Sequence, residues 1–291
     1  MYPYQTGLPL IKEKPMYLSR LKNMDPWEWP EDAGGVFLQT VLDPNASLED
    51  RMLAAELGAD PVAINDELAQ AFLQVAMNAD EPEELRRQSL AALGPALELA
   101  DLEGFDFLDD SPITQDIFQS VHDTLHALFH DPDVPKGIRR NALESSVRAE
   151  SDWHEEAIQQ AYSSNDPEWK LTAVFCMGYV RGFEPEILES LESPEEMIHY
   201  HAVQAAGNWG LEEAWDHVSS LAVSPDTEKE LRLTAIEALG TIQPAKSQSI
   251  LIRLTRDDDD DVSEVALEAM GMAHGMVDFD DSEDDEDDLD E

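Results

Sequence analysis

The hydrophobic positions of this chain recur in a window of ten residues. Within each window the apolar or small residues stand at places 1, 5, 6 and 9, which puts them on one stripe of an α-helix. The clear windows are Leu85–Gly94, Ile138–Val147, Trp169–Gly178, Ile198–Gly207, Leu231–Gly240 and Val262–Gly271, and a weaker copy ends at Gly58. Small residues at places 5 and 10 predict that a neighbouring helix approaches closely.

The stretches between the windows predict a second amphipathic helix in each repeat. One apolar stripe runs from Ile64 to Val75, and another runs from Leu211 to Leu221. An acid or serine followed by proline precedes most windows: Asp43-Pro44, Glu81-Pro82, Asp131-Pro132, Asp166-Pro167, Ser193-Pro194 and Ser224-Pro225. Such pairs favour the first turn of a helix, because proline lacks only a donor that is unpaired there. Residues 33–42 are expected to form a first, unpaired helix, and no segment reads as a strand.

Paired helices of this kind resemble HEAT repeats, in particular the short bacterial repeats of the phycobilin-lyase type. The resemblance covers Asp43 to Ala273, with window ends 29 to 36 residues apart and one wider spacing of 53. It implies an all-α fold, a right-handed α-solenoid of about six to seven HEAT-like helix pairs. Repeats of this family serve many unrelated tasks, so the resemblance is informative for fold and poor for function.

Three regions follow from composition. Residues 1–31 form a Pro/aromatic N-terminal arm, which either caps the first repeat or docks on another protein. Residues 32–276 form the HEAT-like α-solenoid. Residues 277–291 form a tail that is expected to be disordered, because a block of like charge cannot collapse.

Charge narrows the classes of partner. The chain carries 64 acidic and 18 basic side chains, a formal net charge of −46. Direct binding of nucleic acid or of an anionic membrane needs a basic surface, so neither is expected. A single cysteine, Cys176, and the lack of a long apolar run indicate a cytoplasmic protein without disulfides or a membrane span.

The most pointed candidate for metal chemistry is a histidine stripe. His122, His126 and His130 stand one helical turn apart, and His122 to His126 resembles the HExxH motif with Asp123 in place of glutamate. The shorter aspartate would not reach the position where the glutamate acts. We therefore expect a surface stripe, with no metal, no cofactor and no catalytic residue, and keep the three histidines as a weak metal candidate.

Acidic clusters recur on the predicted second helices, which in HEAT solenoids usually line the concave face. The candidate partner-binding residues are Glu155, Glu156, Glu186, Glu189, Glu213 and Asp216. The favoured function is a non-enzymatic scaffold whose acidic groove binds a protein or peptide, most simply a basic one. The alternatives are a nucleic-acid mimic or chaperone for nucleic-acid-binding proteins, a chromophore-lyase-like enzyme, and acidity as an adaptation to a salty cytoplasm.

Overall fold

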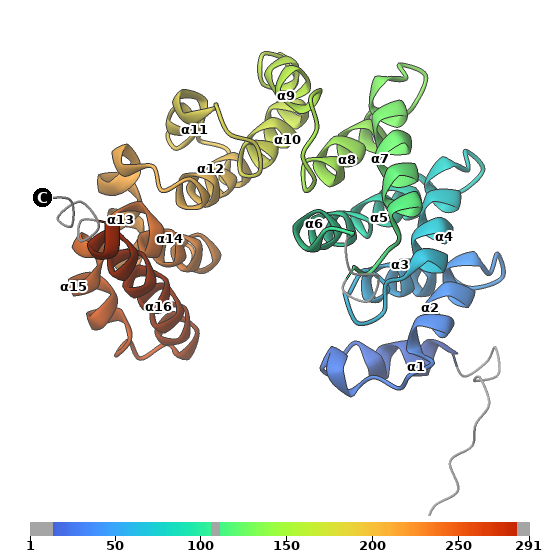
Figure 1. Cartoon of the computed structure of the whole chain (residues 1–291), viewed down its shortest axis with the longest axis horizontal. Helices are drawn as coiled ribbons and strands as arrows, with labels where there is room; N and C mark the ends of the chain where they lie inside the picture. The colour runs from blue at the N-terminus through green and yellow to red at the C-terminus, as the bar shows by residue number, and fades with distance from the viewer. Residues whose placement is uncertain (1–13, 106–110, 284–291) are drawn as a thin grey trace, which may run out of the picture. The chain divides into compact units, whose positions relative to one another are not determined.

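All regular structure in the described part of the chain is helical, as the window pattern predicts. The computed structural model describes residues 14–105 and 111–283 (Figure 1). No helix within these ranges is long and apolar enough to cross a membrane. The chain forms two compact units, residues 1–154 and residues 155–291.

Unit 1 is built from three helix pairs with two additional helices. Its helices are α1 (Lys14–Leu21), α2 (Ala33–Leu42), α3 (Leu48–Leu57), α4 (Asp66–Met77), α5 (Glu83–Ala91), α6 (Gly94–Glu103), α7 (Gln115–His130) and α8 (Lys136–Ser146), with a 3-10 turn η1 at Pro26–Glu28. The pairs are α2–α3, α4–α5 and α7–α8. The expectation of an unpaired first helix was wrong: α2 packs against α3 and α4, and it buries Val36 and Phe37.

The described part of the N-terminal arm lies on the first pair. Leu18 and Leu21 of α1 are buried, and α1 packs against α3. The indole Nε1 of Trp29 donates to the carbonyl of Leu21 at 3.0 Å, and its ring meets Phe37 edge-on at 5.3 Å. Residues 17–31 therefore cover apolar surface of the first pair, whereas residues 1–13 lie outside the described part.

Unit 2 contains four helix pairs. Its helices are α9 (His154–Tyr162), which begins at the boundary, α10 (Pro167–Met177), α11 (Glu184–Ser190), α12 (Glu196–Asn208), α13 (Trp215–Val223), α14 (Lys229–Ile242), α15 (Pro244–Leu254) and α16 (Asp260–Glu283), with a 3-10 turn η2 at Glu212–Ala214. The pairs in the two units agree with the six to seven expected. Helix α16 continues seven residues beyond the boundary expected at residue 276, and the tail after Glu283 lies outside the described residues.

The window helices of unit 2 pack directly on one another. Helix α12 packs on α10 and α14, and α14 packs on α16, whereas α11, α13 and α15 have few mutual contacts (Figure 1). Glycine at place 10 permits this approach: a Cβ on Gly207 would lie 2.7 Å from the Cβ of Ala238, and one on Gly240 would lie 2.8 Å from the carbonyl oxygen of Ala269. The predicted close approach at place 10 is thus confirmed at Gly207 and Gly240, whereas a Cβ on Gly271 would meet no atom within 4 Å. We call α10, α12, α14 and α16 the inner row and α11, α13 and α15 the outer row.

In four pairs the fourth residue of the window helix ties the two helices together. In α3, α5, α8 and α14 this residue is an arginine, whose Nε donates to a carbonyl exposed at the end of the preceding helix. The bonds are Arg51 to Val41 at 2.8 Å, Arg86 to Ala76 at 2.8 Å, Arg139 to Phe129 at 2.8 Å and Arg232 to Ala222 at 3.2 Å. Two of these arginines also reach the turn of the following pair, at Glu81 (2.7 Å) and at Asp257 (2.9 Å). The orphan carbonyls at a helix end are thereby satisfied by a permanent cation.

The acid–proline and serine–proline pairs begin helices less often than the sequence suggests. Asp166 caps α10, accepting from the N–H of Glu168 at 3.0 Å, and Pro167 occupies the first turn as expected. Pro44, Pro132 and Pro225 instead follow the last turns of α2, α7 and α13. There the proline stops one helix, and the next helix starts a few residues later.

Candidate functional site

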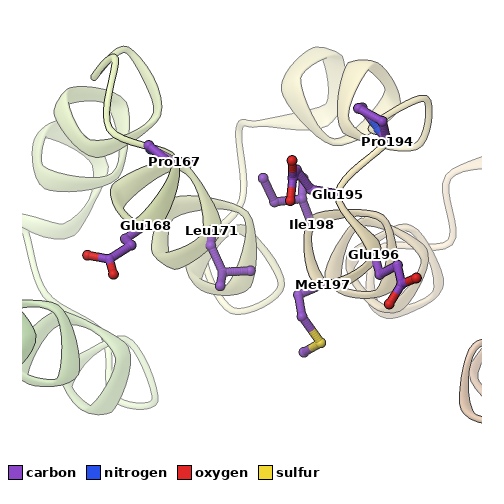
Figure 2. A pocket seen from close by; sticks show the side chains of 8 residues that line it. All are labelled: Pro167, Glu168, Leu171, Pro194, Glu195, Glu196, Met197 and Ile198. Carbon is purple, nitrogen blue, oxygen red and sulfur yellow. The ribbon is translucent and has the colours of Figure 1, made fainter.

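An open groove lies between two successive helices of the inner row in unit 2. It encloses about 470 Å³ at the N-terminal ends of α10 and α12. Its lining residues are Pro167, Glu168, Leu171, Pro194, Glu195, Glu196, Met197 and Ile198. In the view of Figure 2, Leu171 and Met197 lie between Glu168 and Glu196.

The floor of this groove is apolar. Ile198 is place 1 of its window and is buried, whereas Met197, one residue earlier, is 53% exposed. Leu171 of α10 is half-buried beside it. Because the flexible thioether of methionine adapts its shape to different apolar surfaces, Met197 suits contact with a partner.

The rim of the groove is acidic. Glu168, Glu195 and Glu196 are exposed, and the lining residues include no cation. Glu168 and Glu196 lie in the first turns of α10 and α12, where the helix dipole stabilises a negative charge. The site therefore combines an aliphatic surface with three carboxylates.

A smaller hollow of about 100 Å³ continues the inner row. It is lined by residues of α12, α14 and α16, among them Gln204, Asn208, Glu237, Thr241 and Met272. Its character is also mixed, since the exposed Met272 stands beside amide, hydroxyl and carboxylate groups. Surface of one chemical character, apolar with acids, thus recurs along the inner row of unit 2.

The six acidic residues singled out by the sequence lie elsewhere in unit 2. Glu155 and Glu156 begin α9, Glu186 and Glu189 lie on α11, and Glu213 and Asp216 lie in η2 and α13. None of them lines the groove or the smaller hollow. Glu189 lies 3.8 Å from the ammonium of Lys170.

From the sequence, the acidic helices between the windows, here α11 and α13, were expected to line the inside of a groove, and the packing of unit 2 does not favour this. Close helix contacts join the window helices, as on the inner side of a curved stack, and the acidic α11 and α13 belong to the more widely spaced outer row. The sequence could not separate the rows by charge, because Glu168, Glu196 and Glu237 make the window helices acidic as well.

The histidine stripe of α7 forms an aromatic cluster in unit 1. The rings of His126 and His130 lie 5.2 and 5.4 Å from the Trp153 ring, and His130 Nδ1 donates to the His126 carbonyl at 2.9 Å. Among the described residues no three His, Cys, Asp or Glu side chains come together in a way that could hold a metal ion. His122, His126 and His130 are therefore not supported as a metal site there.

A fourth histidine in this cluster was not predicted. His154 is buried, and its Nε2 lies 3.1 Å from the hydroxyl of Ser146. Burial, helped by the neighbouring His122 and His126, lowers the pKa of His154 to about 4. His154 is therefore neutral at pH 7. The sequence did not predict its burial, because it stands among the charged residues of the segment Asp152–Glu155.

Comparison with known proteins identifies the repeats in unit 2. Residues 184–271 match the family model for HEAT repeats. The matched HEAT repeats run from the start of α11 into α16, and no curated protein sequence matches this chain. The narrower resemblance to repeats of the phycobilin-lyase type stays a prediction.

Several solved helical-repeat structures are similar to this chain at low identity. YibA of Escherichia coli is 14% identical with a TM-score of 0.45, and the similarity covers 91% of this chain and 88% of YibA. Human deoxyhypusine hydroxylase is 16% identical with a TM-score of 0.39, covering 84% and 97% of the two chains. Kap121p is 12% identical with a TM-score of 0.40, covering 89% of this chain and 32% of Kap121p.

Proposed function

We propose that this chain is a non-enzymatic scaffold that binds a protein or peptide partner, and that the partner is basic. HEAT repeats expose long helix surfaces that serve as protein-binding faces, and residues 184–271 belong to such repeats. The observation that carries the proposal is the groove between α10 and α12, with its apolar floor and acidic rim.

The groove favours a short segment in which an aliphatic side chain is flanked by lysine or arginine. The aliphatic group would cover Leu171 and Met197, removing apolar surface from water. The flanking cations would face Glu168 and Glu196. The net charge of −46 would accelerate the encounter with a basic partner and repel acidic competitors.

A fluorescein-labelled peptide of sequence Lys-Arg-Leu-Lys-Arg is a direct probe of this chemistry. Fluorescence anisotropy should show saturable binding that weakens with salt as the charges are screened. The same peptide with glycine in place of leucine should bind more weakly, because it leaves the floor of the groove exposed. Binding that ignores both the leucine and the salt concentration would contradict the proposal.

Charge reversals at three places distinguish the groove from the outer row and from bulk charge. Glu196→Lys should weaken the probe peptide roughly twofold to tenfold, since each exposed pair contributes about 0.2 to 1 kcal/mol and the reversal adds repulsion. Glu186→Lys with Glu189→Lys, on α11, is the outer-row control, and Glu237→Lys, which lines the smaller hollow on α14, is an inner-row control away from the groove. A loss confined to the α11 variant would move the site to the outer row, and equal losses in all three would indicate bulk charge alone.

A further inference from the structure

Two positions break the series of fourth residues in the window helices, His199 in α12 and Ser263 in α16. The series in α3, α5, α8, α10 and α14 reads Arg51, Arg86, Arg139, Lys170 and Arg232, all permanent cations at neutral pH. In α12 the fourth residue is His199, the member of the series whose charge changes between pH 5 and 8. His199 lies two residues after Met197 and directly after Ile198, both of which line the groove.

His199 contacts the following pair through a second histidine. Its Nε2 lies 2.7 Å from the Nε2 of His217 on α13, and the Nδ1 of His217 lies 3.5 Å from a carboxylate oxygen of Glu192. In two other pairs the fourth residue meets an acid in the turn of the following pair, Arg51 at Glu81 and Arg232 at Asp257. In α12 the fourth residue instead meets an imidazole on the following helix, and that imidazole is backed by one acid.

The hydrogen bond between the two imidazoles and the ion-pair contact with Glu192 limit how many protons this arrangement accepts. A carboxylate only accepts, so the Nδ1 of His217 carries the proton that faces Glu192. One further proton on His217 is tolerated, because its Nε2 then donates to the lone pair of a neutral His199. A second proton, on His199, leaves two N–H groups pointing at each other and two positive rings in contact. The two imidazoles are therefore hydrogen-bonded when the pair carries no added proton or one added proton, and they repel each other when it carries two.

The surroundings of His199 oppose that second proton. Burial and then His217 lower the pKa of His199, while Glu192 partly opposes them. These charges come from α13 and from the turn that follows α11. Glu196 stands one turn earlier on α12 itself, and among the described residues α10 and α14 add no charge that acts on this ring. Because the folded-state pKa lies below the unfolded value, the contact is present above pH 6.5 and is lost as the pH falls toward the folded value.

We propose that His199, His217 and Glu192 form a pH-sensitive joint between the α11–α12 and α13–α14 pairs, and that it regulates the groove. Acidification to the doubly protonated state separates the imidazoles and loosens the first turn of α12. Met197 and Ile198 stand on that turn, so the floor of the groove is disturbed with it. This effect on binding rests on the proposed function, whereas the joint itself does not.

Hydrogen exchange tests the joint without any partner. In the full-length protein, protection of the amides at residues 196–201, corrected for intrinsic rates, should fall about fivefold between pH 7 and pH 4.5, the factor for one net hydrogen bond. In His199→Gln it should stay constant, because the glutamine carbonyl accepts from His217 at low pH and carries no charge. His274→Gln, an exposed histidine of α16, is the control and should behave as wild type. Equal loss of protection in wild type and His199→Gln overturns the joint.

Binding of the Lys-Arg-Leu-Lys-Arg peptide tests the coupling separately. Between pH 7 and pH 4.5 the dissociation constant of the peptide should rise about fivefold more in wild type than in His199→Gln. The reason is that wild type loses the bond between the two imidazoles at low pH, about one net hydrogen bond, whereas the variant keeps its bond to His217. Both variants share the titration of every other group, so the comparison isolates the joint. A pH effect on exchange with none on binding overturns the regulation and leaves the joint. Absence of binding at pH 7 refutes the proposed function, and the exchange result still decides the joint.

Discussion

Replacing Gly207 by alanine tests the close approach of the inner-row helices. The new Cβ would lie 2.7 Å from the Cβ and 2.9 Å from the Cα of Ala238 on α14. Carbon atoms in contact normally stand about 3.5 to 4.0 Å apart, so α12 and α14 have to separate by most of an ångström. Neither opposing atom belongs to a flexible side-chain end that could turn away. Such overpacking typically costs about 1 to 3 kcal/mol.

Gly271→Ala provides a matched control within the same unit. Gly271 is place 10 of the last window, and a Cβ there meets no atom within 4 Å. Alanine in a helix gains up to about 1 kcal/mol over glycine, and both substitutions receive a gain of this kind. The difference between the two variants therefore isolates the packing cost, so Gly271→Ala should be neutral or stabilising and Gly207→Ala destabilising.

Thermal unfolding followed by far-ultraviolet circular dichroism measures this difference. One kcal/mol shifts the melting temperature of a domain of 150 to 250 residues by about 2 to 4 °C, so the two variants should differ by roughly 2 to 12 °C. The folded spectra should stay helical in both, since neither change alters secondary structure. If Gly207→Ala melts at or above Gly271→Ala, the inner row is not packed as closely as described here.

Further predictions concern single buried groups. The pKa of His154 is about 4 in the folded chain and 6.5 in the unfolded chain, so the unfolded chain takes up the proton first as the pH falls. The free energy of unfolding, measured by urea titration, should therefore fall by about 3 kcal/mol between pH 6.5 and pH 4. In His154→Gln this dependence of the free energy on pH should be missing. Arg51→Lys keeps the charge but loses the bond to Val41 and the paired contacts with Glu81, so urea denaturation should show a loss of about 1 to 3 kcal/mol, unlike the exposed Arg253→Lys. Cys176 is fully buried, so a thiol-reactive dye should label it in urea and hardly at all in buffer; rapid labelling of the native protein would contradict its burial.

Much of the fold could be predicted because the relevant signals are local in sequence. The apolar stripe marks each window helix, and the glycines at place 10 of two windows, Gly207 and Gly240, do permit the predicted approach. Local signals also explain the errors. Pro44 and Pro132 were interpreted as helix starts because proline suits the first turn, yet it equally ends a helix, and only the position of the neighbouring pair decides between the two.

The candidate site was harder to predict because the sequence does not show whether the inner row or the outer row of helices carries the groove. Met197 immediately precedes a window and breaks no pattern, so its exposure follows only from the distance between α10 and α12. Acidic residues on both rows gave no contrast to guide the choice between them. The joint at His199 did leave a signal, a histidine where five other window helices have arginine or lysine, although its partner His217 on α13 could be found only from the structure.

The arginine bonds within the pairs have a consequence for how the chain tolerates changes in length. The arginine and the carbonyl it contacts are ten residues apart in four pairs, and the turns they bridge, 43–47, 78–82, 131–135 and 224–228, each have five residues. In the α9–α10 pair the turn has four residues, and there Lys170 lies over the Tyr162 ring instead. An insertion or deletion inside one of these turns would shift the arginine by at least one residue relative to the carbonyl that its guanidinium contacts. Added chain between α6 and α7 leaves every such bond intact. Natural insertions and engineered fusions should therefore be accommodated between pairs and rejected within them.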